Sequence, residues 1–134
     1  MTLDILDPDG GVRYKGATLE VTRYTYGGGI AIAAVCRDGE PWGTLTVNLV
    51  DEDTGKDCVF VKDYSEGAGN VRTLAAAGLI ETPPVRWARS GFAEIPLCRL
   101  TEKGMQLVRE FDAKASAEVH ADKPKTEELD GEGT

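Results

Sequence analysis

Runs of alternating or continuous apolar side chains mark three segments in the first half of the chain, 19–22, 30–36 and 44–49. Short runs of this kind, with a period of two residues where they alternate, predict β-strands. Three glycines separate the first two segments, and Asp38-Gly39 before the third is typical of a tight turn. We therefore expect three strands that pair antiparallel as consecutive hairpins.

The second half of the chain mixes strand and helix signals. Segment 58–61 is rich in β-forming residues, and segment 93–99 alternates enough to return to the sheet. Asn70 is suited to cap a short helix that Gly78 ends, and Thr101 is suited to open a last helix. The pattern predicts an α+β fold, an antiparallel sheet of four to five strands with two helices packed on one face.

Three large side chains are expected in the core of this fold. Leu74 lies in the first predicted helix, and Phe92 and Leu97 lie just before and within the last predicted strand. Between these elements, segment 81–87 contains two consecutive prolines, which cannot continue a helix. We expect an extended loop there.

Length and composition indicate one domain. A chain of 134 residues is long enough for a single core and too short for two ordinary ones. Large apolar side chains become scarce after Phe111, so the end of the chain cannot offset the entropy of ordering it. The sequence therefore predicts a domain over residues 1–115 and a disordered acidic tail over residues 116–134.

The net charge of −8 excludes some classes of partner. Nucleic-acid binders gain affinity by neutralising phosphates with Lys and Arg, so no direct nucleic-acid partner is expected. The apolar runs are far below the roughly 20 residues that cross a bilayer, so no membrane span is expected. Residues 1–10 lack the basic start and apolar centre of a signal peptide, which makes the cytoplasm the expected location.

Cysteine usage points to free thiols. Cys36, Cys58 and Cys98 are odd in number and widely spaced, which matches neither a disulfide framework nor the paired cysteines of a zinc site. We expect all three to be buried packing residues.

No segment has the complete pattern of a catalytic or cofactor site. The sole histidine, His120, falls in the predicted tail, and the glycine run 27–29 lacks phosphate-binding spacing. The acidic loop 51–57 begins like a calcium loop but has Lys62 where the last carboxylate ligand is needed. The sequence leaves open whether two carboxylates converge in a pocket. We predict no catalytic residue, no cofactor, no metal and a protein that is not an enzyme.

A cationic, aromatic segment is the best candidate for binding a protein partner. Arg86, Trp87 and Arg89 combine the residue types that are enriched at interface hot spots, in a chain that is otherwise acidic. The alternative is that Trp87 packs onto the sheet while both guanidiniums stay solvated.

Three sequence blocks resemble a known family. They are VFVKDYSE at 59–66, AGL at 77–79 and SGF-x-x-x-PLCRL at 90–100. Over roughly residues 18–104 the chain resembles the bacterial family of domains of unknown function numbered 4313. That family has no assigned activity, and the resemblance implies a small bacterial accessory protein, often carried on phages, plasmids or conjugative elements. Segment 81–87 departs from the family pattern, so the resemblance assigns no role to Trp87.

The leading interpretation is a non-enzymatic protein-interaction module. One alternative is a winged-helix DNA-binding regulator, because the GLI at 78–80 and the LTEKG at 100–104 resemble the sequence pattern of that class. That fold needs two helices before Asn70, where strands are predicted instead. Another alternative is an acidic mimic of nucleic acid that inhibits a host defence enzyme, since negative surface charge can imitate a phosphate backbone.

Overall fold

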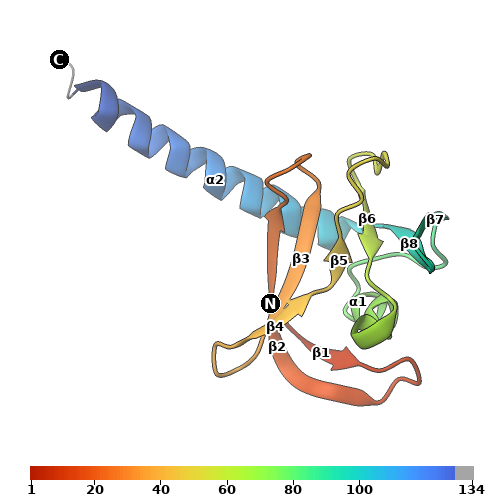
Figure 1. Cartoon of the computed structure of the whole chain (residues 1–134). Helices are drawn as coiled ribbons and strands as arrows, with labels where there is room; N and C mark the ends of the chain where they lie inside the picture. The colour runs from red at the N-terminus through yellow and green to blue at the C-terminus, as the bar shows by residue number, and fades with distance from the viewer. Residues whose placement is uncertain (129–134) are drawn as a thin grey trace.

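The protein is built from two antiparallel sheets of four strands each and two α-helices, in a computed structural model that describes residues 1–128 (Figure 1). Sheet A follows chain order, with β1 (Thr2–Leu6), β2 (Val12–Arg23), β3 (Ile30–Val35) and β4 (Pro41–Thr44). Sheet B has the order β5 (Thr46–Val47), β6 (Cys58–Val61), β8 (Ala93–Arg99) and β7 (Arg86–Ser90). The predicted α+β class is confirmed.

The backbone ladders of the two sheets meet at Leu45. The Leu45 amide donates to the Ile32 carbonyl at 2.7 Å, which extends the β3–β4 ladder. The Leu45 carbonyl accepts from the Lys62 amide at 2.8 Å, which extends the β5–β6 ladder. The predicted strand 44–49 is therefore divided at Leu45 between two sheets. The prediction of one sheet of four to five strands was wrong, because the alternation of side chains does not reveal a change of hydrogen-bonding partner.

The main core lies between sheet A, one face of sheet B and the helices. It includes Ile5 and Ile32 from sheet A, Val61 from sheet B, Leu74 from α1 (Asn70–Ala76) and Val108 from α2 (Glu102–Glu128). A smaller cluster covers the other face of sheet B, and its buried members are Cys58, Phe60, Ala88, Ile95 and Leu97. The inner strands β6 and β8 of sheet B are thus buried on both faces, which explains their continuous apolar runs.

Two of the three predicted core residues are buried. Leu74 is 0% exposed and Leu97 is 4% exposed. Phe92 is fully exposed, so that prediction was wrong. The reason is a two-residue turn between paired Ser90 and Ala93, in which Gly91 has a φ of +62° and Phe92 occupies the tip.

The helices begin close to their predicted positions. The Thr101 hydroxyl accepts from the Gly104 amide at 3.1 Å, as expected for the cap of α2. At the start of α1 the capping carboxylate comes from elsewhere: Asp63 accepts from the Gly69 and Val71 amides at 2.9 and 3.2 Å. α1 packs against β1 and α2 packs against β2.

The last helix continues away from the sheets to Glu128 (Figure 1). Beyond the core contact of Val108, an exposed ion pair joins this helix to sheet A: the Arg23 guanidinium donates twice to the Asp112 carboxylate, at 2.8 and 3.0 Å. Residues 116–128 are thus helical in the structure, whereas the sequence predicts that they belong to a disordered tail. Residues 129–134 lie outside the described part of the chain. The domain limit at residue 115 stays a prediction. Within residues 1–128, every helix is too short or too polar to cross a lipid bilayer.

Candidate interaction surface at the free edge of β7

The β7 strand was predicted as a loop and is the outer strand of sheet B. Its pairing with β8 is regular from Arg86 opposite Leu97 to Ser90 opposite Ala93. Of its five residues only Ala88 is buried, so the strand has no alternating apolar pattern that sequence reasoning could detect. Among the described residues, none pairs with the outer edge of β7.

The orientation of the β7 backbone follows from the turn. In a two-residue hairpin the closing pair is hydrogen-bonded, and bonded and non-bonded pairs then alternate. Ser90, Ala88 and Arg86 therefore direct their backbone groups toward β8. Trp87 and Arg89 direct theirs outward, and this assignment agrees with Pro96 opposite Trp87, because proline has no amide proton to donate.

Arg86 holds a neighbouring loop in place. Its guanidinium donates to the Glu52 carboxylate at 3.0 Å and to the Asp53 carbonyl at 2.9 Å. It also lies 5.5 Å above the centre of the Phe60 ring, within the range of a cation–π contact. Arg86 thus holds the loop at residues 52–53 beside the smaller cluster of sheet B. Its main role is structural.

Trp87 and Arg89 lie on the opposite face of the strand from Arg86, because side chains alternate along it. Trp87 is 55% exposed, so more than half of its surface is available to a partner. Arg89 is exposed and its guanidinium lies 3.3 Å from the Glu94 carboxylate on β8. The predicted trio is therefore close in space but divided between two faces.

Two further exposed apolar side chains flank the trio, and sequence reasoning missed both. Phe92 stands at the tip of the β7–β8 hairpin, and Val85 directly precedes β7 with 51% of its surface exposed. The spacing of Gly91 between two strand-forming segments was the signal for a hairpin tip. Together with Trp87 they form an apolar margin along the free edge.

A second cationic, aromatic cluster lies on sheet A. The Tyr14 and Trp42 rings are 5.5 Å apart, Arg13 lies 5.7 Å from the Trp42 ring and Arg37 lies 5.3 Å from the Tyr14 ring. Arg13 donates to the backbone carbonyls of residues 66 and 68, at 2.9 and 3.3 Å. Both aromatic rings are partly buried against the main core. This cluster fastens sheet A to the segment before α1.

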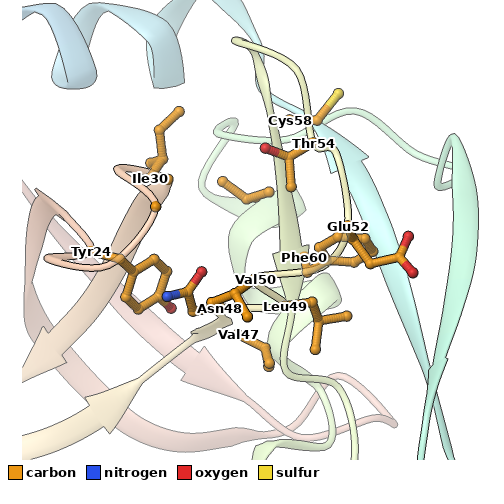
Figure 2. Close-up of a pocket in the computed structure, with 13 residues that line it drawn as sticks. Tyr24, Ile30, Val47, Asn48, Leu49, Val50, Glu52, Thr54, Cys58 and Phe60 are labelled. Carbon is orange, nitrogen blue, oxygen red and sulfur yellow. The ribbon is translucent and has the colours of Figure 1, made fainter.

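Figure 2 shows a small cavity between the β2–β3 turn and the loop after β5. Its volume is about 70 Å³, whereas pockets for small molecules usually measure about 300–1,000 Å³. Its lining includes the Tyr24 phenol and the Cys58 thiol. Burial raises the pKa of the Tyr24 phenol, and burial and the adjacent Asp57 raise the pKa of the Cys58 thiol. Both groups are therefore held protonated at neutral pH.

The cysteines only partly match their prediction. Cys58 and Cys98 are buried, but Cys36 is partly exposed at the end of β3. Burial raises the pKa of the Cys98 thiol to about 11, which removes its nucleophilic thiolate form at neutral pH. Within the described residues no three His, Cys, Asp or Glu side chains form a group that could hold a metal ion.

Comparison with known protein families identifies the family of this chain. The model of the family described as domain of unknown function DUF4313 matches residues 18–122, most of the chain, and the protein belongs to this family. Comparison with curated proteins gives no match, and comparison with solved structures gives none either. The matched range includes both cationic, aromatic clusters except for Arg13 and Tyr14.

Proposed function

We propose that this protein is a non-enzymatic interaction module that binds an extended segment of a protein partner along the free edge of β7. The observation that carries the proposal is the exposure of Trp87 and Phe92 beside outward-facing backbone groups. Addition of a strand to a sheet edge is a common mode of peptide recognition, in which the backbone supplies affinity and the flanking side chains supply specificity.

The composition of this edge supports a protein as the occupant. Tryptophan and arginine are enriched at interface hot spots, and a truncated hot spot typically costs about 2 kcal/mol or more of binding. The edge lacks two of the common protections against pairing, since β7 contains no proline and its ladder with β8 has no bulge. Its two arginines are the only charged side chains of the strand, and both already face carboxylates of the same chain.

The alternative functions have less support. The described elements before Asn70 are strands and one short 3-10 turn, whereas a winged helix needs two helices there. Phosphate binding by Arg86 and Arg89 would compete with Glu52 and Glu94. Enzymatic chemistry would require activated groups, and the thiols of Cys58 and Cys98 have raised pKa values. We also place the protein in the cytoplasm, because free cysteines suit a reducing compartment.

Photo-crosslinking in the cell that encodes the protein tests this proposal. A photoreactive phenylalanine derivative replaces Trp87 in one variant and Phe92 in another. The matched control carries it at Tyr26, which is 73% exposed on the β2–β3 turn of the other sheet. We expect discrete protein adducts from positions 87 and 92 and none from position 26. Adducts only from position 26, or none from any position, would contradict the proposal.

A further inference from the structure

We propose that the strand received by β7 is the β7 of a second copy of this chain, paired antiparallel about a two-fold axis at Ala88. The inference rests on the proposed function and names its partner. A two-fold pair of this kind would join two copies of sheet B, each ordered β5–β6–β8–β7, into one continuous sheet.

The backbone directions of β7 suit this register. An axis at Ala88 puts Trp87 of one copy opposite the partner's Arg89, and these are the two residues whose amide and carbonyl groups face outward. Each such pair exchanges two hydrogen bonds, so the two-fold arrangement forms four. The pair at the axis is a non-bonded one, in which the Cα atoms approach to about 4.5 Å. Ala88 is the smallest side chain of the strand, which permits that approach.

Side chains are complementary in the same register. Trp87 lies across from the partner's Arg89, and such a pair can form a cation–π contact. Arg89 keeps its own Glu94 at 3.3 Å, so its charge stays compensated as its exposed surface is covered. On the other face Arg86 lies across from the partner's Ser90, a small polar residue that leaves the Arg86–Glu52 pair undisturbed.

The same register accounts for the exposed apolar margin. Phe92 at one end of the hairpin comes beside the partner's Pro84 and Val85 at the other end, and the symmetric contact repeats it. Val85, Trp87 and Phe92 are three of the seven large apolar residues that the described part of the chain exposes. Mutual coverage of these three by one symmetric contact favours a second copy over an unrelated segment.

Neighbouring registers are worse. Hydrogen bonding requires outward residues to face outward residues, so the axis can move only by a whole residue. An axis at Trp87 would pair Arg89 with the partner's Val85, whose amide already donates to its own Leu97 carbonyl at 2.7 Å, so this register forms fewer hydrogen bonds. An axis at Arg89 puts two arginines directly opposite, and like charges across a strand pair are destabilising. The register centred on Ala88 avoids both.

Sedimentation equilibrium of the full chain over a concentration series tests the inference. We expect a monomer–dimer equilibrium for the natural sequence. Trp87→Pro removes outward amide protons that the monomer does not use, so folding should persist while two of the four intermolecular bonds are lost. Loss of two hydrogen bonds should raise the dissociation constant of the dimer by roughly tenfold or more. Trp87→Val is the matched control that keeps the amide and loses only the ring.

Two charge variants test the pairing of Trp87 with the partner's Arg89 independently. Trp87→Glu should retain the dimer, because the new carboxylate lies opposite the partner's Arg89. Arg89→Glu should weaken the dimer, because it puts a carboxylate opposite the indole. Circular dichroism and thermal melts check that each variant is folded.

The outcomes separate this inference from the proposed function. A natural protein that stays monomeric up to about 1 mM, far above the micromolar range of specific dimers, overturns the inference. Crosslinks to another protein from positions 87 and 92 would then leave the interaction-module proposal standing. A dimer that the folded Trp87→Pro variant forms equally well also overturns the inference, because its interface lies elsewhere.

Discussion

Two clusters of arginine and aromatic side chains have nearly the same composition and opposite placement. On sheet A, Tyr14 and Trp42 pack partly buried against the core, and Arg13 donates to backbone carbonyls. On the edge of sheet B, Trp87 is mostly exposed beside backbone groups that no described strand uses. Residue types alone therefore do not distinguish a fastening from a binding surface. The difference is whether the sheet continues beyond the cluster.

The largest expected effect sets the scale for stability and concerns neither cluster. Leu74→Ala should lower the free energy of unfolding by about 2–5 kcal/mol, because Leu74 is 0% exposed in the main core. Denaturant melts measure it, with Val12→Ala at an exposed position as the control. A loss below about 0.5 kcal/mol, the range of surface substitutions, would place Leu74 outside the core.

The direct comparison is between the two tryptophans. Trp42→Ala should destabilise the fold by about 2 kcal/mol, below the range for fully buried tryptophan because Trp42 is only partly buried. Trp87→Ala should change stability by less than about 0.5 kcal/mol. Paired denaturant melts give both values. Equal losses in the two variants would remove the distinction between the clusters.

The two arginines of β7 should also differ. Arg86→Ala removes two hydrogen bonds and a cation–π contact and should cost about 1 kcal/mol. Arg89→Ala breaks one exposed ion pair and should cost less than about 0.5 kcal/mol. Thermal melts at low and high salt compare them. A larger loss for Arg89→Ala would mean that Arg86 does not anchor the loop at residues 52–53.

The smallest perturbation is chemical labelling of thiols in the native state. Cys36 is partly exposed and should react first at neutral pH, whereas Cys58 and Cys98 should react slowly because they are buried with raised pKa values. Mass spectrometry after timed labelling gives the order in which the three thiols react, and rapid modification of Cys98 would contradict it.

The raised pKa of Cys98 also predicts a change of stability with pH. The raised Cys98 pKa favours folding while the thiol stays protonated. That contribution should disappear as the pH rises from about 9 toward 11.

The sequence predicted those elements whose side chains carry a periodic pattern. Strands around 30–36 and 58–61 and helices near Asn70 and Thr101 are present in the structure. β7 was missed because an edge strand with only Ala88 buried has no such pattern. The division into two sheets was missed because it depends on the two hydrogen bonds of Leu45, and side-chain patterns carry no information about them.

The candidate site was predicted in composition and not in geometry. Arg86, Trp87 and Arg89 were identified from residue type, but strand alternation separates Arg86 from the other two. Phe92 was assigned to the core from its apolar side chain, and only the two-residue turn places it in solvent. Exposure at a hairpin tip is a property of backbone pairing, which sequence reasoning recovers only when both strands are recognised.

The position of Leu45 has a consequence for how the molecule opens. The Leu45 amide is bonded in the ladder of sheet A and the Leu45 carbonyl in the ladder of sheet B, so a displacement of this residue disturbs both ladders at their boundary. The two sheets should therefore open as one cooperative unit instead of two. In native-state hydrogen exchange, the amide protons of Leu45 and Lys62, one from each ladder, should exchange with the same free energy, equal to that of global unfolding.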